Sequence, residues 1–322
     1  MMRAPRALAA AVRKPDGEIA VQTWPYQPIT DRVPLLKLPV LRGGVILVES
    51  MVLGMRALSW SADQAVEAEA PRDAAQQRRD QLAITGTLFM SLGLGVVFFV
   101  ALPHLLTQGA LWLLGLSFGV ENPIFHLIAG TIKLCLFLAY LWTIGRLPDV
   151  QRLFQYHGAE HMSIYAWEAG QDLEVDTVRR WTRFHPRCGT SFLLFVVVAS
   201  ILVFTPVFAL MPPLPFDGAL RTLVQILIKV PLMLPVAGLA YEAIRLSSRM
   251  YAVPAFRALL LPGLWLQRLT TRDPDDAQLE VAIRSLAAAW EAHLAQGAAD
   301  DMGLEGAAFQ TGVAVAGGPP HG

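Results

Sequence analysis

Charged residues are scarce in this sequence, and the two signs balance. Only 16% of the 322 residues are Asp, Glu, Lys or Arg, with 26 basic and 26 acidic side chains, whereas soluble domains have about 25% charged residues. Without net charge there is no overall field to attract nucleic acid, so no nucleic-acid partner is expected. Hydrophobic residues make up 54% of the chain, and this excess over the roughly 45–50% of soluble domains favours a membrane protein.

Cysteine is nearly absent as well. Cys135 and Cys188 are the two cysteines, which excludes a disulfide framework and makes reduced thiols the default. The apolar part of residues 1–14 is too short for the core of a signal peptide, and the acidic sequence PDGE follows it. A secreted protein is therefore not expected.

Four stretches are long and apolar enough to cross a bilayer of about 30 Å as helices. Two contain no Asp, Glu, Lys or Arg, and each of the other two contains one lysine. They are residues 82–106, 122–145 (with Lys133), 189–216 and 222–241 (with Lys229). Buried helices of soluble proteins rarely stay uncharged over such lengths. The sequence therefore predicts an all-α integral membrane bundle of about four transmembrane helices.

Basic residues near the ends of these stretches indicate their orientation. The connections at 107–121 and 212–219 contain no Lys or Arg, whereas basic residues precede the first stretch, occupy the central connection and follow the fourth. They are Arg72, Arg78, Arg79, Arg146, Arg152, Arg179, Arg180, Arg183, Arg187, Arg245, Arg249 and Arg257. We expect both termini and the central segment to be cytoplasmic.

The remaining segments complete five expected regions. Residues 8–23 alternate around the turn sequence KPDG and predict a β-hairpin, and residues 45–60 predict an amphipathic helix along the membrane surface. A helix is expected from the Pro-Asp-Asp sequence at 274–276 to about Ala295, and a disordered Gly/Ala-rich tail from Gly297. The regions are 1–80 (hairpin and interfacial helix), 81–145 (transmembrane helices 1–2), 146–190 (central cytoplasmic segment), 191–245 (transmembrane helices 3–4) and 246–322 (C-terminal helices and tail).

The central segment carries the residues that are typical of a metal site. His157, Glu160 and His161 form the pattern H-x-x-E-H. On a helix, residues four apart share a face, so the two imidazoles can hold one ion while Glu160 acts as a base. This is the inverted form of a metalloprotease motif. Glu168 lies on the same face, and Gly170 favours the end of the helix.

A second group, His185 and Cys188, lies at the cytoplasmic mouth of the third apolar stretch. Imidazole and thiolate are good zinc ligands, so we expect a divalent metal, zinc in the first place, held by His157, His161, His185 and Cys188. Three protein ligands would make a catalytic site and four a closed structural one. The spacing allows both.

Two other interpretations use the same atoms. Cys188, near a helix N-terminus and flanked by Arg183 and Arg187, would be a nucleophile with His185 or His157 as its base. The histidines would otherwise be hydrogen-bonded surface residues without a metal.

Lys133 and Lys229 lie near the middle of apolar stretches, where a charge is costly and often functional. With Pro231 and Pro235 expected to break or kink the fourth stretch, the lysines would form a cationic pocket for an anionic lipid or substrate headgroup. They would otherwise reach the membrane surface along their own side chains. Together with Glu242 they would also suit a small transporter.

Several segments resemble one family across most of the chain. They are residues 11–19 (AVRKPDGEI), 48–54 (VESMVLG), 144–149 (IGRLPD), 157–161 (HGAEH), 185–191 (HPRCGTS) and 262–267 (PGLWLQ). In these segments the chain resembles the YqhQ-like family of bacterial integral membrane proteins, a domain of unknown function whose members are sometimes labelled metal-dependent enzymes. The resemblance implies a multi-pass protein of the bacterial cytoplasmic (inner) membrane. It also implies a glycine-rich segment, GGQAVxEGV, before the Met-Met-Arg with which this sequence begins.

Taken together, the sequence favours a metal-dependent hydrolase at the cytoplasmic membrane face, with Glu160 as its catalytic base. Its expected partners are the lipid bilayer and an anionic lipid or lipid-linked substrate. A non-enzymatic membrane scaffold with a structural metal or hydrogen-bonded His/Cys cluster is the alternative, and a small transporter is a further one.

Overall fold

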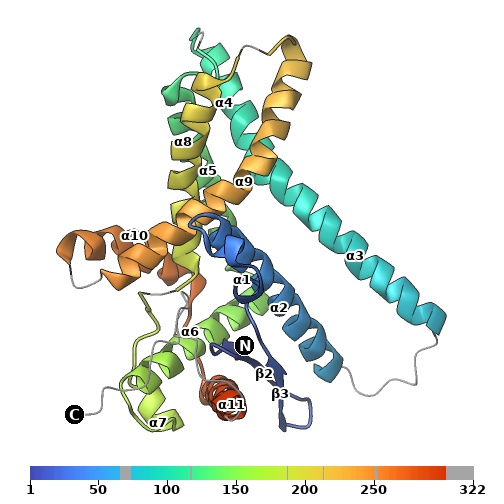
Figure 1. Ribbon diagram of the computed structural model, residues 1–322, viewed down its shortest axis with the longest axis vertical. Helices are drawn as coiled ribbons and strands as arrows, with labels where there is room; N and C mark the ends of the chain where they lie inside the picture. Colours follow the sequence, from blue (N-terminus) through green and yellow to red (C-terminus); the bar gives the residue numbers. More distant parts are fainter. Residues whose placement is uncertain (66–73, 117, 187, 213, 251–252, 302–322) are drawn as a thin grey trace. The chain divides into compact units, whose positions relative to one another are not determined.

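The computed structural model describes residues 1–65, 74–116, 118–186, 188–212, 214–250 and 253–301 of the chain (Figure 1). These residues form two compact units. The sheet unit comprises Met1–Glu67, Trp142–Phe192 and Tyr241–Gly322, and the helical unit comprises Ala68–Leu141 and Leu193–Ala240. Each unit is described by itself.

The sheet unit begins with three antiparallel strands in the order β1-β2-β3. They are β1 (Met2–Arg3), β2 (Ala7–Arg13) and β3 (Ile19–Pro25). Gly17 has a φ of 90°, and its N–H donates to the carbonyl oxygen of Lys14 at 3.0 Å. The hairpin predicted around KPDG is therefore confirmed, while the short strand β1 was not foreseen.

Three helices pack around this sheet. They are α6 (Pro148–Glu168), α7 (Val175–Val178) and α11 (Asp276–Asp301). Ala9 of β2, Ala159 of α6 and Leu279 of α11 are all fully buried in one core, and Ser285 donates a hydrogen bond to the carbonyl of Ala9 at 3.1 Å. This packing fixes α6, the helix that carries the H-x-x-E-H sequence, against the sheet and α11 (Figure 1).

The C-terminal helix is longer than predicted. It begins at Asp276 as expected but continues to Asp301, so the predicted start of the tail at Gly297 is wrong. The rest of the predicted tail, 302–322, lies outside the described residues.

A long helix, α2 (Leu41–Ala65), follows α1 (Ile29–Arg32) and the short helix η1 (Pro34–Lys37). Near its end, Leu53, Ala57 and Trp60 pack with Trp24 and its neighbours in the sheet, and the rings of Trp24 and Trp60 meet edge to face at 5.9 Å. The predicted interfacial helix at 45–60 is thus part of a longer helix, with one face covered by the sheet.

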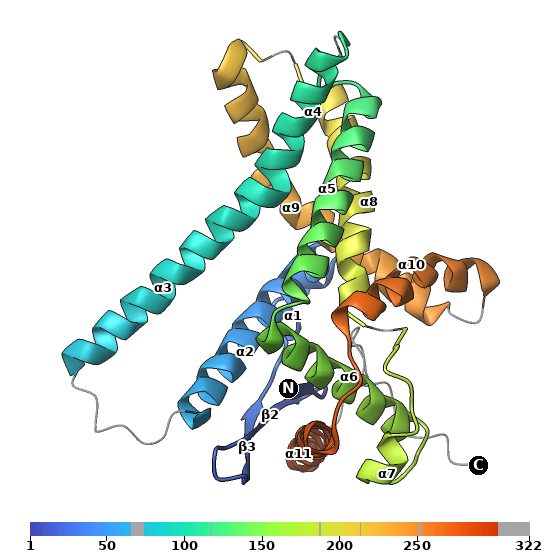
Figure 2. The same cartoon turned by 180° about the vertical axis from the view of Figure 1, so that it is seen from behind.

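The helical unit is built from helices, three of which continue into the sheet unit at one end. It contains α3 (Ala74–Val96), the π-helix η2 (Val97–Ala101), α4 (Leu102–Leu113) and the greater parts of α5 (Pro123–Ile144), α8 (Thr190–Leu210) and α9 (Gly218–Arg249). In both ribbon views α5 and α8 run side by side (Figures 1 and 2). Gly130 permits this approach, because a Cβ there would lie 2.6 Å from Ile201. Small residues let apolar helices approach closely in membranes.

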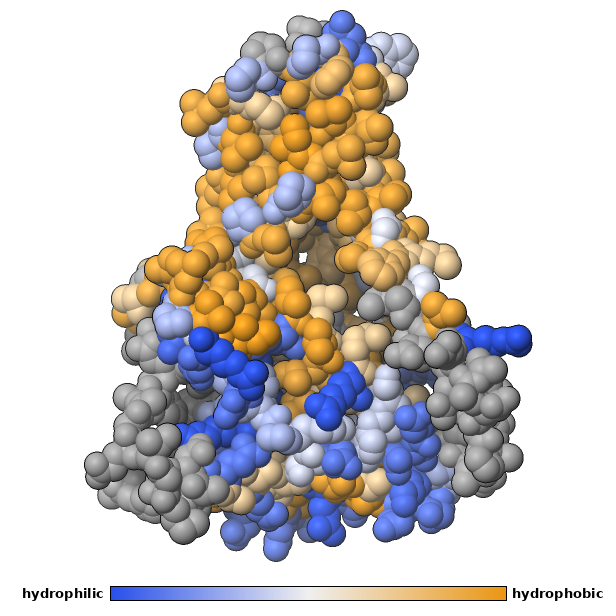
Figure 3. Space-filling model, turned by 45° about the vertical axis from the view of Figure 1, so that its right-hand side comes forward, coloured by the Kyte–Doolittle hydropathy of each residue, from blue (hydrophilic) through white to orange (hydrophobic). Residues whose placement is uncertain are grey.

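Hydrophobic side chains cover most of the face of the helical unit that is in view in Figure 3. Trp112, Leu202 and Leu227 are among its exposed apolar side chains. Exposure on this scale is costly in water and is typical of a surface that contacts lipid.

The helix α9 runs through Pro231 and Pro235 without interruption. The prolines therefore do not break the helix, whereas the kink predicted as the other outcome is visible as a bend in α9 (Figures 1 and 2). Pro231 follows Lys229 within the continuous helix.

Five helices among the described residues are long and apolar enough to cross a membrane. They are Leu41–Gln64, Phe89–Leu113, Pro123–Ile144, Phe192–Leu210 and Gly218–Ser247. The structure therefore has five candidate spans instead of the four predicted, because α2 extends several residues beyond the segment 45–60 on both sides and reaches spanning length. A multi-pass membrane protein follows from these lengths and compositions.

Candidate functional site

The helix α6 places His157 and His161 on one face, as their spacing predicts. It starts at Pro148, whose fixed φ suits a first helical turn, and ends before Gly170, which has a φ of 67°. On another face, a Cβ at Gly158 would lie 2.2 Å from the carbonyl oxygen of Arg272. The segment between α10 (Pro254–Thr270) and α11 therefore lies directly on α6.

Cys188 comes from the turn just before α8. Its N–H donates to the carbonyl of His185 at 3.2 Å, and its sulfur lies 3.1 Å from the hydroxyl of Thr190. The backbone N–H of Thr190 also points at this sulfur, at 3.4 Å. Cys188 is buried, with 5% of its surface exposed.

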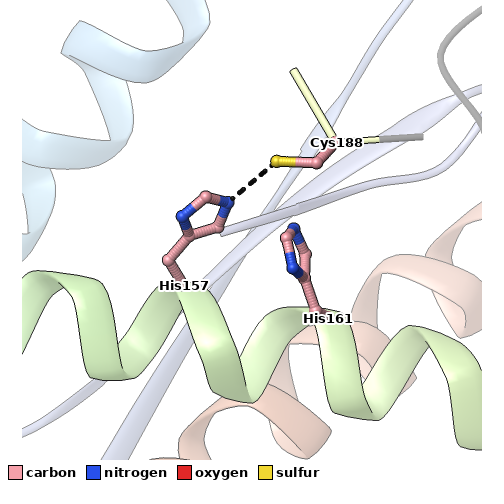
Figure 4. Close-up of side chains that lie close together, drawn as sticks. All are labelled: His157, His161 and Cys188. Carbon is pink, nitrogen blue, oxygen red and sulfur yellow. Dashed lines mark hydrogen bonds between the residues drawn. The ribbon is translucent and has the colours of Figure 1, made fainter. Parts of the chain in front are cut away.

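His157, His161 and Cys188 come together above α6 (Figure 4). One donor atom from each lies within 4.8 Å of the others. The sulfur of Cys188 is 3.3 Å from Nε2 of His157, and the two imidazole centroids are 4.4 Å apart. The structure thus brings three of the four predicted metal ligands together, with His161 and Cys188 buried and His157 partly buried.

Backbone carbonyls orient both rings. Nδ1 of His157 donates to the carbonyl of Thr270 at 2.9 Å, and Nδ1 of His161 donates to that of Arg183 at 2.5 Å. Since a carbonyl only accepts, each Nδ1 carries the proton, which leaves the Nε2 lone pair of the neutral ring for another partner. Such outer bonds are typical of metal-binding histidines.

The cluster also changes the acidity of its members. Burial alone would raise the pKa of the Cys188 thiol, but hydrogen bonds from His157 and His161 and their charge outweigh burial and lower it to about 5. Burial alone would lower the pKa of His157, but its contacts with Cys188 and Thr270 outweigh burial and raise it to about 9. Without an ion, the pair is thiolate and imidazolium near neutral pH, which supplies the thiolate needed for a metal ligand or a nucleophile.

His185 lies beside this group but is not part of it. Its Nε2 is 3.6 Å from the carboxylate of Glu168, and its ring centroid is 5.7 Å from that of His161. Gln267 of α10 accepts from the backbone N–H of His185 and donates to its carbonyl, both at 2.8 Å. The arrangement of the described residues therefore gives a three-residue group, with His185 paired to an acid.

Glu160, the predicted base, also lies outside the group. Its carboxylate accepts from the amino group of Met1 at 2.6 Å, although its charge is close enough to raise the pKa of His157. The catalytic role of Glu160 stays a prediction.

Sequence reasoning missed the residues that orient the cluster. The carbonyls of Thr270 and Arg183 belong to the backbone, so side-chain identity gives no signal for them. Gln267 is a detectable exception, because it ends the PGLWLQ segment that the family resemblance singles out.

The lysines predicted to be functional lie together in the helical unit. Lys133 of α5 and Lys229 of α9 line one small cavity. Glu242, the third residue of the transporter alternative, belongs to the sheet unit, where it forms a bidentate ion pair with Arg42 of α2.

Comparison with known proteins agrees with the resemblance found in the sequence. Residues 38–292 match the family described as "Protein of unknown function (DUF1385)". The chain is 30% identical over 282 residues to "Uncharacterized protein YqhQ" of Bacillus subtilis (strain 168), which covers 85% of this chain and 84% of that protein. No solved structure matches.

Proposed function

The chain belongs to the DUF1385 family of proteins of unknown function, so its function has to be inferred from its own residues. We propose that it is a metal-dependent membrane hydrolase. Its ion is held by His157, His161 and Cys188. The observation that carries this proposal is the pair of Nδ1 bonds to backbone carbonyls, which turns both Nε2 atoms toward one buried thiol.

The donor atoms suit zinc. Zinc binds histidine nitrogen at about 2.0–2.1 Å and cysteine sulfur at about 2.3 Å, so neighbouring ligands of a tetrahedral site lie about 3.5 Å apart. The 3.3 Å between Nε2 of His157 and the sulfur of Cys188 agrees with that spacing. A borderline-soft set of two imidazoles and one thiolate favours zinc over magnesium or calcium.

A three-ligand site leaves one position open, which is typical of catalytic rather than structural zinc. The bound ion supplies a Lewis acid for hydrolysis. Thr270 and Arg183 keep the two rings in their ligand tautomer, and Glu160 is the predicted proton acceptor. The Glu168–His185 pair is a second acid–base pair next to His161.

The place of the site suggests a substrate at the membrane. Cys188 lies four residues before the apolar helix Phe192–Leu210. A site next to the end of an apolar helix can contact a lipid headgroup, whereas a molecule dissolved in the cytoplasm would not need it there. We therefore propose a lipid-linked or anionic lipid substrate.

A structural role for the same ion is the second candidate. The cluster joins three separate segments, namely α6, the turn before α8 and the end of α10, through His157, Cys188 and Thr270. A structural metal site of this kind would contribute directly to the free energy of folding.

The variant Glu160→Gln separates the two candidates, because it keeps the size of the side chain but removes its basicity. We expect Glu160→Gln to keep its metal and its fold while losing the ability to rescue a strain that lacks the protein. Wild-type rescue by Glu160→Gln, together with metal loss and unfolding of Cys188→Ser, would assign the site to the structural candidate instead.

We further propose that four of the five apolar helices cross the bacterial cytoplasmic membrane and that α2 lies at its surface. The packing of Leu53, Ala57 and Trp60 on the sheet supports this, because a helix with one face covered by the sheet is not fully surrounded by lipid. With four crossings, both termini and the site share the cytoplasmic side, where the basic residues cluster.

A further inference from the structure

A second cluster of chemistry lies in the helical unit, apart from the proposed metal site. Lys229 of α9 and Lys133 of α5 line one cavity with His104 of α4 and Ser200 of α8. Lys229 is 3% exposed, Ser200 is 1% exposed and His104 is fully buried. From these residues we infer that the cavity binds a small monovalent anion of halide size, such as chloride.

The polar groups of the cavity are arranged as donors. Nζ of Lys229 donates to Nδ1 of His104 at 2.7 Å, so Nδ1 accepts and the ring carries its proton on Nε2. That Nε2 is buried and interacts with the side chain of Gln225, whose buried Oε1 accepts its hydrogen. The neighbouring His126 uses its Nε2 to donate to the carbonyl of Val120 at 2.8 Å.

Ser200 has no proton to offer an ion. Its hydroxyl donates to the carbonyl of Val197 at 2.7 Å and accepts from Nζ of Lys133 at 3.2 Å. The hydrogens still available to a ligand are therefore those of Lys133 and Lys229. A donor set of this kind attracts an anion and repels a cation.

The charge of the cavity is uncompensated. The residues that line it include two lysines and no Asp or Glu. Both Nζ atoms lie 5.5 Å from the ring centroid of Phe204, and an aromatic face attracts a cation without neutralising it. Charges inside an apolar unit are normally paired, and an anion between the lysines supplies that pairing.

The size of the cavity selects the anion. The cavity has a volume of about 10 Å³, which is enough for about one particle of the size of a water molecule. A phospholipid headgroup or a phosphate is larger. A cavity of this size therefore fits a monatomic ion better than the anionic headgroup expected from the sequence.

Radiolabelled chloride measures this site directly on the full-length protein, purified in detergent and gluconate buffer. We expect saturable binding of one chloride per chain, displaced by bromide but not by phosphate or phosphatidylglycerol. The variants Lys229→Met and Lys133→Met should bind chloride at least about tenfold more weakly, the size expected when one charged hydrogen bond is lost. Lys37→Met is the matched control, because Lys37 pairs with Asp31 at the surface and should change nothing.

Ser200→Ala keeps the test decisive if the lysine variants do not fold. It removes only the acceptor that positions Lys133 and should also weaken chloride binding. No chloride binding by the wild type, equal binding by Lys229→Met, or displacement by phosphatidylglycerol but not by bromide would overturn the inference.

Discussion

The sulfur of Cys188 lies 3.3 Å from Nε2 of His157, across 31 residues of sequence. The contact joins the turn before α8 to the middle of α6, and Thr270 holds the far side of the same imidazole at 2.9 Å. Three distant segments of the sheet unit thus meet at one ring. The predictions below follow from this arrangement and from the helices around it.

Replacing Gly158 by alanine should destabilise the sheet unit. The new methyl group would lie 2.2 Å from the carbonyl oxygen of Arg272, and overpacking of this kind costs about 1–3 kcal/mol. We expect a lower melting temperature and weaker metal retention for Gly158→Ala. The control is Gly54→Ala in α2, where nothing lies within 4 Å of the added Cβ, and where alanine should stabilise the helix by up to about 1 kcal/mol. Equal melting temperatures for the two variants would contradict the close packing of α6 on the Arg272 segment.

In metal-free protein, the ultraviolet absorbance of the Cys188 thiolate should persist well below the usual thiol range and disappear near pH 5. The reason is that His157 and His161 lower the pKa of this thiol to about 5 against its burial. Cys188→Ser should remove the signal, and Cys135→Ser should leave it. A Cys188 signal that appears only near pH 9, the ordinary value of a thiol, would rule out the ion pair.

The same pair should give metal-free protein a pH-dependent stability. The lowered pKa of Cys188 stabilises the fold fully above about 9 and loses its effect as the pH falls through about 5. The raised pKa of His157 stabilises it fully below 6.5 and loses its effect as the pH rises through about 9. Between pH 6.5 and 9 the rising contribution of Cys188 offsets the falling one of His157, so the difference in melting temperature between wild type and Cys188→Ser should be constant there and should shrink as the pH falls from 6.5 to 5. A difference that does not vary with pH would contradict the coupling.

Single cysteines introduced into a cysteine-free background test the proposed membrane topology. An impermeant thiol reagent should label Asp172→Cys only after lysis, because 146–190 is proposed to be cytoplasmic. Asp217→Cys, in the connection between α8 and α9, should react in intact cells. Labelling of Asp172→Cys from outside would refute the model of four crossings with both termini inside.

The sequence predicted local features well, because they depend on short-range rules. The turn at Gly17 and the shared face of His157 and His161 follow from turn chemistry and from the 3.6-residue period. The ends of α2 were not predicted, because the residues on either side of 45–60 carry no signal that distinguishes an interfacial helix from one of spanning length.

The finer parts of the site could not be predicted for a different reason. Whether His185 contacts the thiol or Glu168 depends on how α10 packs, and the carbonyls of Arg183 and Thr270 leave no mark in the sequence. Likewise Lys229 stood out as a charge in an apolar stretch, while its partner His104 lies 125 residues away.

X-ray absorption at the zinc edge, with metal content measured on the same samples, tests the central claim most directly. The account predicts one zinc per chain in protein purified from zinc-supplied cells, with two nitrogen neighbours from histidine and one sulfur. His161→Ala and Cys188→Ser should lose that zinc, and Cys135→Ser should retain it with an unchanged spectrum. Wild-type protein without bound zinc, or zinc without a sulfur neighbour, would contradict the account.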